Sequence, residues 1–291
     1  MASPFELLQS VATEYGATLY PGATGGLVDI SVTRPGGTVR AFKLHLTIAG
    51  EHVFAREAPD HHLLPKFCPD RHINHDQSFC LGWGDGNPSR IIDEVAARQW
   101  WATVYQFLTH QASANARGVF PGAENGRAHG DAAKHQAIAE RAAERLGAEF
   151  KAAASMGNFL VREDVRPNKH RLELWRANRL VARVSLRSKT LLAERLPCPC
   201  GSSPECEIDT CSDHAEALAT FILEQHRCVV ADKAYLDQCA AAGDICCGTL
   251  EECGLRKAIR RKQASSAKKE SSQRARTSKY WLPPAKSKRP R

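Results

Sequence analysis

Residues 63–89 read LLPKFCPDRHINHDQSFCLGWGDGNPS, a stretch rich in Pro, His, Asp and Gly that lacks helical or strand periodicity. A long irregular segment inside a compact domain is uncommon and is more often functional than not. Within it, Cys80 stands between two apolar residues, and the polar residues Asn74 and His72 precede it. A thiolate is a good nucleophile, and a nearby polar group can stabilise the oxyanion of an acyl transfer. Spacing alone leaves two interpretations of Cys80: an acyl carrier or a small buried hydrophobic residue.

The segments on either side of this stretch predict an α+β fold. Residues 4–15 have the apolar spacing of a short amphipathic helix, and residues 17–48 alternate like antiparallel strands. After the irregular stretch, Ser89 is placed to cap a helix that includes WWATVYQFL, and a further helix is expected over residues 131–146. The expected order is therefore a helix, an antiparallel meander, the irregular segment and then helices.

Three motifs resemble prokaryotic ubiquitin-conjugating-enzyme-like proteins: RHINHDQSFCLGW, the Trp-rich helix WWATVYQFL, and AHG before a helix. The resemblance covers about residues 1–150 and implies a ubiquitin-conjugating-like catalytic domain in which Cys80 carries a ubiquitin-like protein as a thioester. It also implies an activating-enzyme-like protein as donor and an acceptor protein as target. Members of this group are often associated with bacterial antiphage defence operons.

The sequence leaves open which residue stabilises the oxyanion, because the His-Pro-Asn motif of ubiquitin-conjugating enzymes is missing. An ungapped comparison puts His72 at the position of the family's Asn, whereas a two-residue deletion puts Asn74 there. Either side chain can donate a hydrogen bond, and we favour Asn74 because an amide does not titrate. Cys68 is the rival nucleophile, in a Phe-Cys-Pro setting without the Leu-Gly that follows Cys80. His129 is expected to cap or pack against the next helix, with a catalytic role as the alternative.

The C-terminal half is rich in cysteine, with nine of the eleven cysteines between residues 198 and 253. In a reducing compartment this density favours metal binding over disulfides. Four soft ligands hold one structural zinc ion, so one or two ions are expected; an iron–sulfur cluster and a core of unliganded thiols are the alternatives. The predicted metal ligands are Cys198, Cys200, Cys206, Cys211, His214, His226, Cys228, Cys239, Cys246, Cys247 and Cys253.

These ligands define an expected cysteine-rich domain over residues 151–256, which a metal would stabilise because its core is small. Strands are expected near residues 159–161 and 171–187, and a helix from His214 to His226. The combined prediction is a ubiquitin-conjugating-like α+β fold followed by a small metal-binding domain.

The net charge of +8 belongs to the C-terminal end of the chain. Residues 256–291 hold 14 Lys and Arg and one acid, a local charge of +13, which leaves −5 for the rest. Residues 257–291 are therefore expected to be a disordered basic tail, and nucleic acid is an expected partner only through this tail. No apolar run reaches the roughly 18 residues needed to span a membrane, and the N-terminus does not look like a secretory signal, so we expect a cytoplasmic protein.

Overall fold

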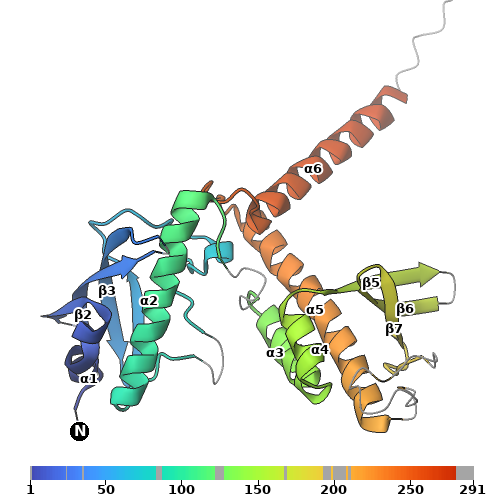
Figure 1. Ribbon diagram of the computed structural model, residues 1–291. Helices are drawn as coiled ribbons and strands as arrows, with labels where there is room; N and C mark the ends of the chain where they lie inside the picture. The colour runs from blue at the N-terminus through green and yellow to red at the C-terminus, as the bar shows by residue number, and fades with distance from the viewer. Residues whose placement is uncertain are drawn as a thin grey trace, which may run out of the picture.

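The computed structural model of the protein forms two bodies, each with its own antiparallel sheet and helices (Figure 1). A long C-terminal helix extends away from both bodies. None of the described helices combines the length and apolar character needed to cross a membrane. The structure describes residues 2–23, 25–34, 36–82, 87–121, 128–166, 169–192, 198, 208 and 211–279.

The N-terminal body is a four-stranded antiparallel sheet with helices packed on it. In chain order it contains α1 (Pro4–Val11), the short helix η1 (Ala12–Tyr15), β1 (Ala17–Gly22), β2 (Gly25–Thr33), β3 (Val39–Ala49), β4 (His52–Glu57), the turn η2 (Pro69–Arg71) and α2 (Glu94–Arg117). The strands pair in the order β1-β2-β3-β4. In β2, Val28, Ile30 and Val32 are buried and their neighbours exposed, because successive strand residues point to opposite faces. The predicted order of helix, meander and helices is confirmed.

One apolar core fills this body. Trp100 and Trp101 of α2 are fully buried against the sheet and α1. The indole nitrogen of Trp101 donates a hydrogen bond to the carbonyl of Leu8 over 3.0 Å, so the ring ties α2 to α1. The Trp-rich sequence therefore forms the predicted apolar helix face.

Helix α2 begins later than the sequence suggested. Its N-cap is Asp93, whose Oδ1 accepts a hydrogen bond from the backbone nitrogen of Ala96 at 2.8 Å. The prediction that Ser89 caps this helix is wrong. The Ser89 hydroxyl instead forms a hydrogen bond with Nδ1 of His52, 3.0 Å away. Strand β4 was also missed, because the sequence loses clear alternation after residue 50.

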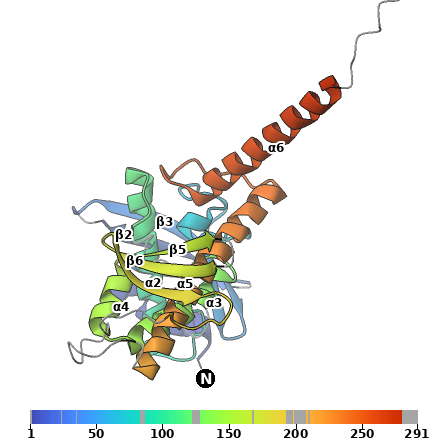
Figure 2. The ribbon, with the colours of Figure 1, turned by 90° about the vertical axis from the view of Figure 1, so that its right-hand side faces the viewer.

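The C-terminal body is a three-stranded sheet packed against helices. It contains α3 (Ala132–Arg145), α4 (Ala148–Ser155), β5 (Phe159–Arg166), β6 (Lys169–Arg176), β7 (Arg179–Ser185) and α5 (Ser212–Ala242). The sheet has the order β5-β6-β7 and lies beside α5 in both views (Figure 2). Leu172, Leu174 and Val184 face Phe221 and Ile222 in its core. The predicted strand pair near residues 171–187 is present, and the predicted helix is longer than His214–His226.

Two expected boundaries change. Helix α3 shares its core with α5 through residues such as Ala142 and Leu146, so it belongs to the C-terminal body. We therefore propose a boundary between residues 121 and 128 in place of residue 150. The expectation of disorder from residue 257 is wrong as far as Lys279, because helix α6 (Gly254–Lys279) continues through it. The rest of the expected tail lies outside the described residues.

The two bodies meet at the turn η2, which lies in the irregular segment before Cys80. Oδ2 of Asp70 accepts a hydrogen bond from the backbone nitrogen of Gly254 at 2.9 Å. Nη1 of Arg71 donates to the hydroxyl of Thr249 at 2.9 Å. The C-terminal body is thereby fixed next to the segment that contains the candidate nucleophile.

Candidate functional site

Cys80 is held at the edge of the N-terminal core by its backbone. The preceding residue, Phe79, is buried, stacks on Phe107 with ring centroids 4.5 Å apart, and donates its N–H to the carbonyl of Ala55 at 2.8 Å. The N–H of Cys80 itself donates to the carbonyl of His72 at 2.8 Å. Its side chain is partly exposed. The thiol is thus accessible on a fixed backbone, which an acyl carrier requires.

Burial changes the acidity of this thiol. It raises the pKa of Cys80, and a backbone hydrogen bond from Gly82 only partly opposes the increase. The thiol form therefore predominates at neutral pH, and the reactive thiolate becomes more abundant as pH rises.

Asn74 lies in an exposed turn that closes just before Cys80. Its backbone N–H donates to the carbonyl of Ser78 at 3.0 Å, and its side-chain Nδ2 donates to the Ser78 hydroxyl, also at 3.0 Å. That hydroxyl donates to Oδ1 of Asp76 at 2.6 Å. Releasing Asn74 from Ser78 costs one exposed hydrogen bond, about 0.5–1.5 kcal/mol, so the amide is free to turn toward a reacting group.

His72 occupies the left-handed region, with φ 54°, at the end of η2. Its ring is partly buried between Phe120 and His129, whose centroids lie 5.7 and 5.8 Å away. Burial, reinforced by the neighbouring His129, lowers the pKa of His72 to about 4. The ring is therefore neutral at pH 7 and has one N–H to donate.

A cavity of about 600 Å³ joins these residues to the C-terminal body. The N-terminal body contributes Cys80, Asn74 and His72 to its lining. The C-terminal body contributes His129, before α3, and Tyr235 and Gln238 of α5. Sequence reasoning did not identify the α5 residues, because nothing in their local pattern marks them as neighbours of residue 80.

His129 forms an ionic contact within the C-terminal body and also lines this cavity. Its Nδ1 lies 2.7 Å from Oδ1 of Asp232 on α5. Burial lowers the pKa of His129, but the hydrogen bond and charge of Asp232 outweigh it and leave that pKa raised. Burial raises the pKa of Asp232, but the hydrogen bond and charge of His129 outweigh burial, so that pKa is lowered overall. The packing role expected for His129 is observed, and its imidazole also faces the candidate site.

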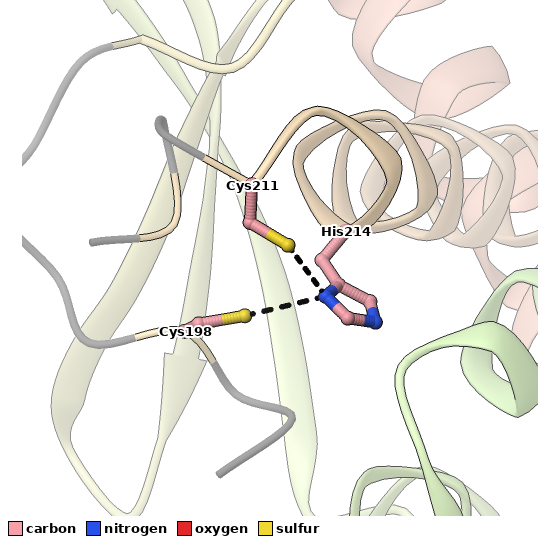
Figure 3. A group of neighbouring side chains, drawn as sticks. All are labelled: Cys198, Cys211 and His214. Atoms are coloured by element: carbon pink, nitrogen blue, oxygen red, sulfur yellow. Dashed lines mark hydrogen bonds between the residues drawn. The ribbon is translucent and has the colours of Figure 1, made fainter. Parts of the chain in front are cut away.

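Cys198, Cys211 and His214 form a candidate metal centre at the start of α5 (Figure 3). Nδ1 of His214 lies 2.8 Å from the sulfur of Cys211 and 3.5 Å from that of Cys198. The three ligand atoms all lie within 4.8 Å of one another. Two thiolates and an imidazole are a donor set that fits a metal ion, and they would supply three of the four positions of a tetrahedral site. The other predicted ligands nearby, Cys200 and Cys206, lie outside the described residues.

The remaining predicted ligands do not join this centre. Cys239 lies with His75 and Asp244, where Nε2 of His75 is 2.9 Å from Oδ2 of Asp244. His226 and Cys228 belong to no group of three potential ligands in the described part of the chain. Cys246, Cys247 and Cys253 gather at the contact between the two bodies. The described members of the predicted ligand set are therefore spread over separate places in the structure.

Comparison with known families divides the chain in the same way. The sequence model of a prokaryotic E2 domain matches residues 23–122, and that of a cysteine-rich domain C-terminal to the E2 domain matches residues 128–255. No curated protein and no solved structure matches the chain. The junction agrees with the boundary indicated by the packing of α3, and it assigns AHG to the cysteine-rich part.

Proposed function

Because this chain belongs to the prokaryotic ubiquitin-conjugating-enzyme-like (E2) family and carries a cysteine-rich domain after its E2 domain, we propose that it transfers a ubiquitin-like protein through a thioester on Cys80. The observation that carries the proposal is the position of Cys80. Its thiol is partly exposed, its backbone is held by the hydrogen bonds of the Phe79 and Cys80 N–H groups, and it shares a cavity with two polar side chains. Loading and discharge both require such a site.

The reaction has two acyl-transfer steps. The Cys80 thiolate attacks the thioester carbonyl carried by an activating-enzyme-like protein; a new C–S bond forms and the donor's thiolate leaves. An amine of an acceptor protein then attacks the Cys80 thioester. An amide bond forms, the C–S bond breaks, and the amine loses a proton as the Cys80 thiolate leaves.

The oxyanion donor is assigned to a side chain. The Cys80 N–H is already engaged by the His72 carbonyl, so the backbone next to the nucleophile is not free to serve. Asn74 and His72 both line the cavity, and the lowered pKa of His72 makes its ring a neutral donor at pH 7 as well. We assign the role to Asn74, because its exposed amide has only a surface hydrogen bond to give up.

The candidate centre at Cys198, Cys211 and His214 is assigned to structural zinc. Zinc at this position would hold the start of α5 against the segment that follows β7. An iron–sulfur cluster would use the same thiolates and give visible absorbance. The donor set of two thiolates and one imidazole favours zinc.

A second function is supported by helix α6. Arg260, Lys268 and Lys269 are exposed on it, and the helix extends away from both bodies. These features suit a non-catalytic adaptor whose basic helix and metal module bind nucleic acid or an acidic protein surface. The two functions differ in whether Cys80 forms an adduct.

The proposal is tested by loading in the presence of an activating enzyme, ATP and the ubiquitin-like protein, followed by a non-reducing gel. The full chain should form an adduct that disappears on adding a thiol reductant. Cys80→Ala should form none, and the matched control Cys228→Ala should load normally. An adduct undiminished in Cys80→Ala would overturn the assignment. Cys68 is an unsuitable carrier because it is 1% exposed.

The same proposal places the reaction in the bacterial cytoplasm, where Cys80 and the zinc-binding thiols stay reduced. It also places the gene in an antiphage defence operon, on the strength of the resemblance to proteins of such systems. An activating-enzyme-like gene and a ubiquitin-like gene beside this one would support both statements.

A further inference from the structure

Four cysteines from both bodies gather where the bodies meet. The sulfur atom of Cys68, at the start of η2, lies 3.3 Å from that of Cys247. The sulfur atoms of Cys246 and Cys253 are 3.4 Å apart. All four side chains pack in one hydrophobic cluster, in which Cys68 and Cys253 are buried. We call these four residues the junction cysteines.

The backbone on both sides of the junction cysteines is fixed. The contacts of Asp70 with Gly254 and of Arg71 with Thr249 join η2 to the loop between α5 and α6. The N–H of Glu251 in the same loop donates to a carbonyl of the N-terminal body at 2.8 Å. The sulfur atoms are therefore brought together by a docked interface and not by a flexible loop.

A buried positive charge, that of Arg71, lies beside the junction cysteines and is stabilised by negatively charged groups. Arg71 is fully buried, and its hydrogen bonds go to the side chain and carbonyl of Gln111 and to the hydroxyl of Thr249, which are all neutral acceptors. Among the described residues no carboxylate forms a salt bridge with it. A buried cation without an anion is costly. Glu57 acts on this charge without forming a salt bridge, and four thiolates on a divalent ion, which carry a net charge of −2, would add to that counter-charge.

The sulfur distances distinguish a metal site from disulfides. A disulfide bond is about 2.05 Å long, so neither pair is bonded, and the structure records all four as free cysteines. With Zn–S bonds of about 2.3 Å, the sulfur atoms of a tetrahedral site lie roughly 3.8 Å apart. Each observed pair is close enough to form one edge of such a tetrahedron. Unlike the ligand atoms of the Cys198 group, no three of these four sulfur atoms lie within 4.8 Å of one another, so binding would draw the two pairs together.

We propose that Cys68, Cys246, Cys247 and Cys253 bind a second zinc ion that joins the E2 domain to the cysteine-rich domain. Three of its ligands come from the loop before α6, and the fourth comes from the E2 domain. The E2 domain therefore contributes a metal ligand, and the metal would add to the hydrogen bonds that already join the two domains. This inference does not depend on whether Cys80 carries a thioester.

A metal at the junction would also steady the segment that holds Cys80. Cys68 and Ile73 exchange backbone hydrogen bonds, each 3.1 Å long, across η2. The carbonyl of His72, inside this closed turn, accepts the hydrogen bond from the Cys80 N–H. Loss of the junction metal would release Cys68, the first residue in this series of hydrogen bonds that leads to Cys80.

Zinc analysis of the full chain, purified without a polyhistidine tag, tests the proposal. The wild type should contain about two zinc ions per chain, one at the Cys198 centre and one at the junction cysteines. Cys68→Ser and Cys247→Ser should each lose one, whereas the matched control Cys80→Ser should keep both. Unchanged zinc content in both junction variants would overturn the proposal.

A second measurement uses only the wild type, so it does not depend on the variants folding. The native protein is treated with an alkylating reagent before and after a zinc chelator, and the labelled cysteines are identified by mass spectrometry. The junction cysteines should be protected until zinc is removed, and all four should then become labelled together. A disulfide between any two of them, or labelling of all four with zinc still bound, would contradict the proposal.

Discussion

The two bodies of this protein are stabilised in different ways. The N-terminal body has one continuous apolar core that includes its sheet, α1 and α2. The C-terminal part has a smaller cluster of its own and shares a second, also smaller, with the N-terminal body, and both clusters contain cysteines. Apolar burial alone can stabilise the first body, whereas we expect the second to need metal because each of its cores is limited. The difference predicts that the bodies respond separately to metal removal and to core mutation.

Metal removal should have the largest effect. Zinc binding contributes about 10–16 kcal/mol in small zinc-stabilised domains. A chelator should therefore unfold the start of α5 and the loop before α6, while the sheet β1–β4 keeps its protection. Hydrogen exchange measured region by region, with and without chelator, follows both bodies at once. A metal-free protein with unchanged protection in both bodies would favour unliganded packed thiols.

A large cavity in the N-terminal core should affect the N-terminal body and leave the metal sites intact. Trp101→Ala removes a fully buried ring and its hydrogen bond to Leu8, so it should lower the free energy of unfolding by about 3–5 kcal/mol. Zinc content should stay at the wild-type value. Val95→Ala on the same helix is the control, since Val95 is 72% exposed and its loss should change little. Urea unfolding followed by circular dichroism measures both; equal effects would refute the assigned core.

Removing the proposed oxyanion donor should affect chemistry far more than stability, because the fold loses only the exposed hydrogen bond to Ser78. Asn74→Ala should slow discharge of the Cys80 thioester to an amine by roughly 10²–10³-fold, the usual effect of one lost donor. Loading should suffer less. Single-turnover discharge of preloaded protein gives the rate. If His72→Ala slows discharge and Asn74→Ala does not, the donor is His72.

A smaller effect is expected from pH at the contact between the bodies. An unfolded chain binds a proton at His72 near pH 6.5, whereas the folded protein resists until about pH 4. Stability from the neutral ring is therefore present above pH 6.5 and is lost as pH falls toward 4. The loss is at most about 3 kcal/mol, at 1.36 kcal/mol per pKa unit.

Two variants distinguish the contribution of His72 to the pH dependence from that of its titratable neighbours, which are His129, His110, Asp70 and Asp232. His72→Asn should flatten the fall in stability between pH 6.5 and 4, because Asn does not titrate and tolerates the left-handed conformation. His62→Gln, at an exposed histidine, should leave the slope unchanged. Chemical denaturation at a series of pH values gives the slope. The same slope in wild type and His72→Asn would exclude His72 as its source.

Sequence periodicity predicted the N-terminal fold well, because strands such as β2 alternate strictly and α2 carries a broad apolar face. It missed β4, whose sequence merges into the irregular segment. It also took α6 for disorder, since a helix with few apolar residues has no amphipathic pattern to detect. Local pattern therefore predicted the elements that bury one face and missed those that do not.

The candidate site was only partly accessible from sequence. Cys80, Asn74 and His72 lie within nine positions, so their proximity followed from the motif. Tyr235 and the junction of Cys68 with Cys247 depend on how the two bodies dock, and nothing in the local sequence encodes that contact. Cys68 was weighed as a rival nucleophile for this reason, although its sulfur faces the cysteines of the other body.

The most direct measurement of the central claim compares wild type with Cys80→Ser in the loading reaction. A serine oxygen at residue 80 would form an oxygen ester, which a thiol reductant does not cleave. We expect a reductant-sensitive adduct on the wild type and a slower-forming, reductant-resistant adduct on Cys80→Ser, with mass spectrometry locating the modification at residue 80 in both. A wild-type protein that is folded and fully zinc-loaded yet forms no adduct, or forms it on another residue, would contradict the account.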